Sequence, residues 1–157
     1  MDIPADLERI NDNDIAAVQA QTVSQCTDDK DRTREAATVN DSIFSGSSGE
    51  FISFSFVNTR LGIPDKPNCT EEDYLDDYEE FNTATAAGYG IEQTYGDRVR
   101  VSLGGAEYVR DTCTYNDGDG VVYFYVRKLD DDLMCVIQIS AFDEYIKTPE
   151  HYEALFK

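Results

Sequence analysis

The amino-acid sequence predicts an α+β fold in which a central antiparallel sheet has helices packed on both faces. Apolar residues recur at helical spacing before residue 38 and again over about 70–88, whereas the last third is a series of strand-like segments separated by turn residues. In Val121–Val126 both alternating sets of side chains are apolar or aromatic. Such a strand needs cover on both sides, so helices are expected on each face of the sheet.

The chain of 157 residues is predicted to be a single domain, residues 1–157. Residues 1–37 are expected to form a helical, acidic N-terminal part. The β-rich body is expected to cover 38–157, with helices at about 70–88 and 148–157. A chain of this length buries roughly 68–70% of its unfolded surface, so it needs neither metal nor disulfides to fold.

The N-terminal part is predicted to hold three helical pieces. Pro4 favours a helical turn over Ala5–Ile10. The polar run Asp12–Asp14 is suited to cap a helix over about 13–26 that has one narrow apolar stripe. Asp28–Ala37 is strongly charged and is expected to form another exposed helix.

The period of the apolar residues changes at Thr38, where a β-hairpin is predicted. Val39–Phe44 and Phe51–Val57 form its strands, and Ser45–Gly49 supplies the turn. Phenylalanine and serine alternate imperfectly in the second strand, which predicts either a bulge or burial on both sides. Arg60–Asn68, with its glycine and prolines, is expected to be a loop.

A helix over 70–88 follows, because Thr70 and Asp73 match a capping box and Gly88 is suited to end it. Its buried face is expected to contain Tyr74, Leu75, Tyr78 and Phe81. Its acids are interpreted as a solvated face: Glu71, Glu72, Asp73, Asp76, Asp77, Glu79 and Glu80.

The last third is predicted to contain five strands and one short helix. The strands are Ile91–Tyr95, Val99–Leu103, Ala106–Tyr115, Val121–Lys128 and Leu133–Ile139. Turn residues at 116–120 and 129–132 would close two consecutive hairpins. The helix over 148–157 is expected to dock on the sheet through Tyr152, Leu155 and Phe156.

The net charge of -19 excludes several function classes. It results from 32 acidic against 13 basic residues, and residues 1–80 hold 19 of the acids and 6 of the bases. Proteins that bind nucleic acid or anionic membranes need clustered Lys and Arg, so neither partner is expected. No apolar run is long enough to span a bilayer directly.

No catalytic signature is present. His151 is the one histidine, which excludes sites that need two of them, and it is interpreted as a structural or solvated residue. The serine-containing turn 46–49 lacks the spacing of a nucleophile elbow. The sequence therefore predicts a protein that is not an enzyme and assigns no catalytic, cofactor-binding or metal residue.

The four cysteines form no C-x-x-C pair, so a zinc ribbon is not expected. Turn symmetry puts Cys113 opposite Tyr123 and Cys135 opposite Val126, with one strand between the two cysteines. Two strand spacings are about 9.6 Å, which disfavours a disulfide between them. A bond between Cys26 and Cys69 stays open, against the alternative of free thiols.

Two further patterns carry little chemistry. Asp117–Gly120 resembles part of a calcium loop, but Tyr115 and Val126 occupy the positions that need acidic ligands, so a hairpin turn is favoured. No nucleotide-binding motif is present, and no cofactor is predicted.

If the protein has a functional surface, its first candidates are three tyrosines: Tyr89, Tyr95 and Tyr145. The alternative is that they are half-buried packing residues.

Five segments follow one another in a recognisable order: Glu71–Asp76, Val101–Tyr108, Tyr123–Asp131, Val136–Ile139 and Glu153–Phe156. Through them, residues 36–156 resemble a domain of lipid-anchored surface proteins from gut Firmicutes. The resemblance implies a Mog1/PsbP-like α/β sandwich and a non-catalytic extracytoplasmic domain for binding or assembly.

The sequence thus predicts a non-enzymatic acidic binding domain of a bacterial cell-envelope lipoprotein, located outside the cytoplasm. Its partner is expected to be a protein or an envelope component, and a lipid anchor would lie upstream of residue 1. The alternative is a cytoplasmic inhibitor or immunity-type protein that uses its charge of -19 to mask a basic protein.

Overall fold

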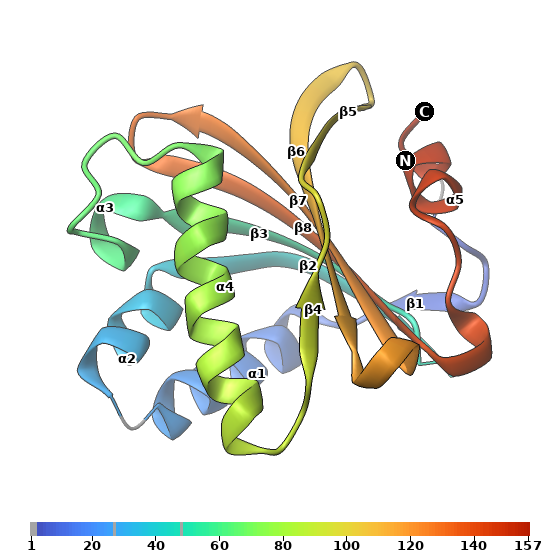
Figure 1. Cartoon of the computed structure of the whole chain (residues 1–157), viewed down its shortest axis with the longest axis horizontal. Helices are drawn as coiled ribbons and strands as arrows, with labels where there is room; N and C mark the ends of the chain where they lie inside the picture. Colours follow the sequence, from blue (N-terminus) through green and yellow to red (C-terminus); the bar gives the residue numbers. More distant parts are fainter. Residues whose placement is uncertain (1–2, 27, 48) are drawn as a thin grey trace.

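A sheet of eight strands forms the centre of the computed structural model, which describes residues 3–26, 28–47 and 49–157 (Figure 1). The strands are β1 (Leu7–Arg9), β2 (Thr38–Gly46), β3 (Phe51–Asn58), β4 (Gln93–Tyr95), β5 (Val99–Leu103), β6 (Ala106–Tyr115), β7 (Gly120–Asp130) and β8 (Leu133–Phe142). Their order is β1-β2-β3-β8-β7-β6-β4, and β5 also pairs with β6. Every described pairing is antiparallel, which confirms the predicted α+β class.

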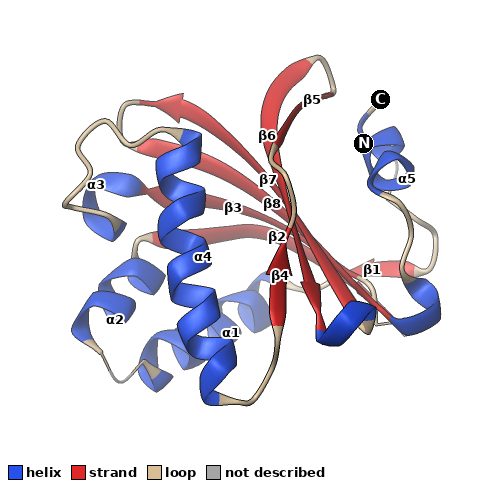
Figure 2. Ribbon diagram, viewed as in Figure 1, coloured by secondary structure: helices blue, strands red, loops and turns tan. Residues whose placement is uncertain are grey.

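The helices lie on two sides of this sheet (Figures 1 and 2). They are α1 (Asp12–Gln25), α2 (Asp29–Ala36), α3 (Thr59–Gly62), α4 (Glu71–Gly88) and α5 (Pro149–Glu153), the last followed by a 3-10 turn over Ala154–Phe156. Helices α1 to α4 lie together on one side, and α5 lies on the other. No helix among the described residues is long and apolar enough to cross a membrane.

Strand β7 contributes to a core on each face, as its sequence predicts. Val122, Phe124 and Val126 pack in a cluster with Tyr74 and Leu75 of α4. On the other face, three different side chains of β7 pack with Tyr152 of α5: Val121, Tyr123 and Tyr125. The two-sided apolar pattern is therefore explained by cover from both directions.

The predicted helical turn over Ala5–Ile10 is wrong, because Leu7–Arg9 forms the edge strand β1. It pairs antiparallel with the end of β2, with Leu7 opposite Gly46. Leu7 is buried in the core on the α5 side. The segment is extended because pairing with β2 provides hydrogen bonds for its main chain and buries the side chain of Leu7.

The expected helix over about 13–26 is confirmed as α1, and the charged segment after it forms α2. The cap of α1 is Asn11 and not the predicted run Asp12–Asp14, which lies inside the helix: the Asn11 side chain accepts a hydrogen bond from the Asp14 N–H at 3.0 Å. Asp28 caps α2 in the same way through the Lys30 N–H at 2.7 Å. Both helices thus begin at side chains that satisfy their free N–H groups.

The predicted hairpin is formed by β2 and β3, but its irregularity lies in the first strand. The register shifts between Asn40 and Ser42, so the bulge is in β2. For β3 the other predicted alternative, burial on both sides, is confirmed, because Ile52 and Val57 are buried in the cores on opposite faces. The expected loop after it contains the short helix α3, which starts where the Asn58 side chain accepts from the Leu61 N–H.

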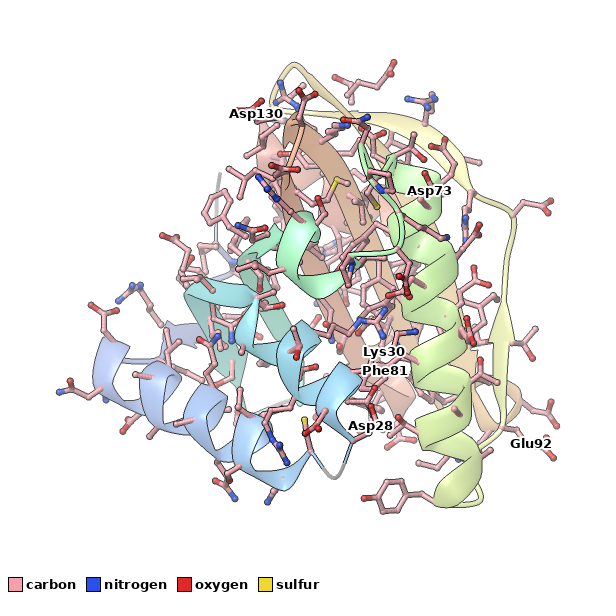
Figure 3. All side chains as sticks on the ribbon, turned by 90° about the vertical axis from the view of Figure 1, so that its left-hand side faces the viewer. Asp28, Lys30, Asp73, Phe81, Glu92 and Asp130 are labelled. Atoms are coloured by element: carbon pink, nitrogen blue, oxygen red, sulfur yellow. The ribbon has the colours of Figure 1, made fainter. Side chains whose placement is uncertain are left out.

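Helix α4 has the predicted capping box, since Thr70 and Asp73 each accept from the other's main-chain N–H at 3.1 Å. The expectation that all its acids are solvated is wrong for Asp77, which is 8% exposed and pairs with Arg34 of α2. The Arg34 guanidinium also lies 4.7 Å from the Phe81 ring. The contacts of Arg34 with Asp77 and Phe81 therefore join α2 to α4. Figure 3 shows Lys30 and Phe81 on the facing sides of these two helices.

The two C-terminal hairpins form, but both predicted cysteine positions are off by one residue. Cys113 faces Val122, and Cys135 faces Arg127. A 3-10 turn over Asn116–Gly118 and a register shift near Lys128 account for the offsets. All four cysteines are free, so the bond left open between Cys26 and Cys69 is not formed.

Candidate binding site

Five uncharged polar side chains lie on the helix-facing side of three neighbouring strands. We name this set the polar row: Asn40 of β2, Ser53 and Ser55 of β3, and Gln138 and Ser140 of β8. The register places Asn40 opposite Ser55, and Ser53 opposite Gln138. The three serines are only 6–7% exposed. Interior strands normally bury apolar side chains at such positions, so the row is an exception in this sheet.

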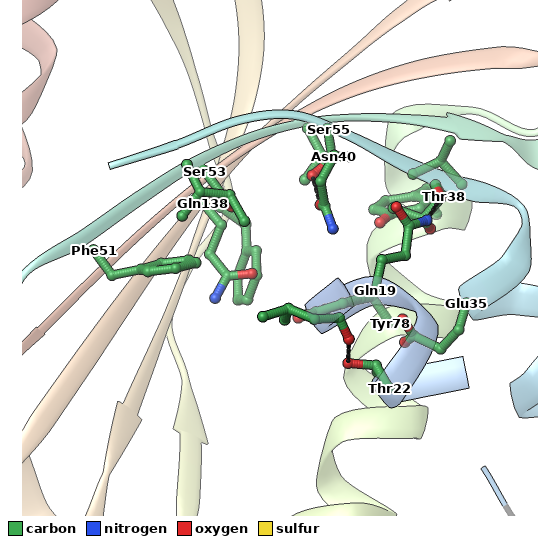
Figure 4. A pocket seen from close by; sticks show the side chains of 16 residues that line it. Gln19, Thr22, Glu35, Thr38, Asn40, Phe51, Ser53, Ser55, Tyr78 and Gln138 are labelled. Carbon is green, nitrogen blue, oxygen red and sulfur yellow. Dashed lines mark hydrogen bonds between the residues drawn. The ribbon is translucent and has the colours of Figure 1, made fainter. Parts of the chain in front are cut away.

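Hydrogen bonds within the row use only part of its capacity. The Ser55 hydroxyl donates to Asn40 Oδ1 at 2.7 Å, and Gln138 Nε2 donates to the Ser140 hydroxyl at 3.2 Å. Each primary amide has a second hydrogen-bonding end. In Figure 4 the Asn40 amide nitrogen and the Gln138 amide point into the space between the strands and α1.

That space is a cavity of about 250 Å³, here called the first cavity. Its floor includes most of the polar row, and its walls are aromatic and aliphatic: Val18, Phe51, Tyr74, Tyr78 and Phe124. Tyr78 is held on Phe124 with ring centroids 4.6 Å apart. Uncharged hydrogen-bonding groups between aromatic walls are typical of sites for small ligands.

Helix α1 covers the first cavity but is weakly anchored. Among its residues only Ile15 is buried, although the helix has 14 residues. Gln19 and Thr22 face the cavity, and the Gln19 side chain donates to the main-chain oxygen of Thr38 in β2. Because α1 buries so little apolar surface, displacing it from the sheet requires little free energy.

The only acid that lines the first cavity is Glu35 of α2, and no described Lys or Arg lines it. Burial raises the pKa of Glu35, while neighbouring Arg34 lowers it. A site without a fixed positive charge offers nothing to pair with a phosphate or carboxylate. The lining of the cavity therefore disfavours an anionic ligand.

A second cavity, of about 380 Å³, opens beside the first. Gln138 lines both cavities, so they meet at this side chain. The second cavity combines Ser140, Asn116 and the carboxylate of Asp119 with four apolar or aromatic residues: Ile91, Tyr115, Val122 and Phe142. Phe142 is 46% exposed, which places an aromatic ring at its mouth.

The histidine and the three tyrosines singled out in the sequence lie outside both cavities. His151 is exposed on α5, with its ring 5.5 Å from that of Tyr152. Neither cavity is lined by any of the three candidate tyrosines: Tyr89, Tyr95 and Tyr145. Tyr89 is 79% exposed, whereas Tyr95 packs against the α4-side core as the packing alternative expects. The described part of the chain has no group of three or more His, Cys, Asp or Glu placed to hold a metal ion.

A charged cluster joins α4 to the sheet. Arg98 pairs with Asp76 at 2.8 Å, with Glu79 at 2.5 Å and with Asp111 of β6 at 3.4 Å. Asp111 is 1% exposed, and burial together with the Glu79 carboxyl raises the pKa of Asp111 to about 6. Arg100 pairs with Glu72 in addition, so several α4 acids are neutralised within the chain itself.

Comparisons of the chain with protein-family models, with curated proteins and with solved structures find no match. The likeness of residues 36–156 to lipid-anchored surface proteins therefore remains a prediction from the sequence. Function is accordingly inferred from the geometry of the two cavities.

Proposed function

We propose that this chain is a non-enzymatic binding domain that holds a small uncharged polar ligand between its sheet and helix α1. The buried polar row carries the proposal. A hydroxyl or amide removed from water costs roughly 1–3 kcal/mol unless it is hydrogen-bonded. A core selected for stability alone would place apolar side chains at Ser53 and Gln138, so their presence beside a cavity is best explained by a ligand that completes their hydrogen bonds.

The surroundings of the row favour binding over catalysis. A serine hydroxyl is a weak nucleophile until a neighbouring base activates it. The lining of the first cavity contains Ser53 and Ser55 but no histidine, and its single carboxylate is Glu35. His151 belongs to α5, whose Tyr152 packs in the core on the other side of the sheet.

The location proposed for the domain is the bacterial cell envelope, as part of a lipid-anchored surface protein with a Mog1/PsbP-like sandwich. The sequence resemblance supports this, and the antiparallel sheet is compatible with it. Protease treatment of intact producing cells tests the location. Degradation of the protein without lysis is the expected result, and protection until lysis would contradict it.

Substitutions within the polar row test the binding function. Ser53→Val and Gln138→Leu should abolish ligand-induced thermal stabilisation in a screen of small neutral compounds. They should also raise the melting temperature without ligand, because apolar groups replace buried polar ones. Ser102→Val, on the exposed part of β5, is the matched control and should retain binding. Lower stability of both row variants would show that the polar groups serve the fold.

The alternative, an acidic protein that masks a basic partner, is supported by the net charge of -19. The pairing of α4 acids with Arg98 and Arg100 weakens it, because it reduces the free charge on the helix that was the expected contact surface. Capture of one basic protein at low salt, lost at high salt and on charge reversal of exposed α4 acids, would favour this alternative over ligand binding.

A further inference from the structure

The two cavities together form a groove across the helix-facing side of the sheet. Their linings include residues of β2, β3, β8, β7 and β6, which are consecutive in the sheet. Five strands spaced about 4.8 Å apart give four intervals, or roughly 19 Å. Gln138 of β8, the central strand of the five, lines both cavities. The groove is therefore longer than a single small ring.

The chemistry of the groove excludes two ligand classes. None of the described lysines or arginines lines either cavity, so phosphates and carboxylates find no partner. A purely apolar ligand would offer no partner to the Ser53 hydroxyl or to the second end of the Gln138 amide, and the loss of water from these groups opposes its binding. A ligand rich in hydroxyl or neutral amide groups avoids both penalties.

Each cavity sets an aromatic side chain beside hydrogen-bonding groups. In the first, Phe51 lies near Ser53 and Gln138 (Figure 4). In the second, Tyr115 and Phe142 accompany Ser140. A pyranose ring has an apolar C–H face and a rim of hydroxyls, and this combination requires an apolar wall with polar groups at its edge.

From these features we infer that the groove binds a neutral glycan of at least two sugar rings, with one ring in each cavity and Gln138 at the linkage between them. The inference rests on the proposed binding function and names the ligand class of the same site.

An extended neutral peptide fits the groove less well. Peptides bind to sheets by pairing their main chain with an exposed edge strand. Strands β3, β8 and β7 are interior, and each already pairs with a strand on both sides. The floor therefore offers side chains only, which suits hydroxyl groups better than a peptide backbone.

Calorimetric titration of the full chain tests the inference. The probes are glucose, N-acetylglucosamine, their β-linked disaccharides, glucuronic acid and a capped alanine–glycine peptide. At least one neutral disaccharide should bind about tenfold or more tightly than its monosaccharide. Gln138→Leu should weaken both by at least about tenfold. Phe142→Ala should remove only the advantage of the second ring, and Phe56→Ala, on the opposite face, should change neither affinity.

Three results would overturn the inference. Equal affinity for monosaccharide and disaccharide would contradict a two-ring groove. Tighter binding of the peptide or of glucuronic acid would contradict a neutral glycan while leaving a binding function intact. If no sugar binds, the glycan is wrong, and the melting temperatures of Ser53→Val and Gln138→Leu decide separately whether the row serves binding at all.

Discussion

The two faces of the central sheet are built from the same strands but have different compositions. On the α5 side, β3 and β8 contribute Ile52, Ile137 and Ile139, which are 0–2% exposed. On the helix-facing side, their alternate positions hold Ser53 and Gln138. Because neighbouring residues of a strand point to opposite faces, one segment supplies a closed apolar core and the floor of a cavity. The helix-facing side has its own apolar core where β6 and β7 pack on α4, so the polar row interrupts that core only where β2, β3 and β8 face α1.

The short helix α5 is anchored more firmly than the longer helix α1, which is one of four helices on the opposite side of the sheet. Helix α5 has 5 residues, yet its Tyr152 is 1% exposed and donates a hydrogen bond to Glu50 at 3.0 Å. Lys147 donates to the same carboxylate at 2.8 Å. Helix α1 has 14 residues and buries one, Ile15. The firmness with which a helix is held on the sheet thus depends on the side chains that it buries and not on its length. Helix α1 is therefore easier to displace than α5.

The largest expected effect is a loss of stability on substitution in the apolar core on the α5 side, called here the closed face. Ile139→Ala removes a side chain with no exposed surface and should reduce the free energy of unfolding by about 3 kcal/mol, measured by urea denaturation. Ligand affinity should not change at a temperature where the variant is folded. A cost below about 1 kcal/mol would contradict the division of roles between the faces.

A smaller effect, dependent on pH, is expected at the charged cluster under α4. The pKa of Asp111 is raised to about 6, so the folded state holds its proton more tightly than the unfolded chain does. This contribution is fully present below the unfolded pKa of about 3.9 and is lost as the pH rises through 6. Asp111→Asn should therefore flatten the stability profile between pH 4 and 7.

The size of that change should be about 2 kcal/mol. Each pKa unit corresponds to about 1.4 kcal/mol, and solvent screening at this partly buried cluster reduces the full value of about 3 kcal/mol. Denaturation at several pH values measures it, with Asp41→Asn, at an exposed position of β2, as the control. The account of Asp111 is wrong if the variant keeps the wild-type slope.

Much of the fold follows from local sequence, and the exceptions have a common cause. The bounds of β5 and β6 match the prediction, and the capping box of α4 forms as expected. Strand β1 is missed because its pairing partner lies more than 30 residues away and three residues are too few to show a period. Asp77 is misjudged because its partner Arg34 belongs to another helix.

Less of the candidate site than of the fold can be predicted from the sequence. The imperfect alternation of serine and phenylalanine in β3 is the one sequence pattern that involves its residues. Which face Ser53 takes depends on the register with β2 and β8, and the cavity depends on how little of α1 is buried. Gln138 carries no local signal, because a single amide in an apolar strand is equally compatible with an exposed position.

An effect of the opposite sign is expected at the polar row. Ser53→Val should increase the free energy of unfolding by about 1 kcal/mol, because an apolar group takes the place of a buried hydroxyl. Ser102→Val gains the same strand propensity at an exposed position, so the difference between the two variants isolates burial. Calorimetric unfolding of both proteins measures it, and a destabilised Ser53→Val would count against a row kept for binding.

The smallest change in stability is expected at helix α1, which covers the first cavity. Asn11→Ala removes the cap of α1 and should cost no more than about 1 kcal/mol globally. Amide hydrogen exchange in α1 should rise severalfold while exchange in α4 and the sheet is unchanged. Equal acceleration throughout the domain would show that α1 is an integral part of the fold.

The most direct test of the central claim is a map of NMR chemical-shift changes on addition of the tightest-binding neutral disaccharide. Shifts should be concentrated at Ser53, Gln138 and the residues of α1 that face the cavity, while Leu7 and Tyr152 in the core on the α5 side stay unchanged. Shifts centred on the α5 side, or none on the polar row at saturating ligand, would contradict the claim that one face of this sheet is kept for binding.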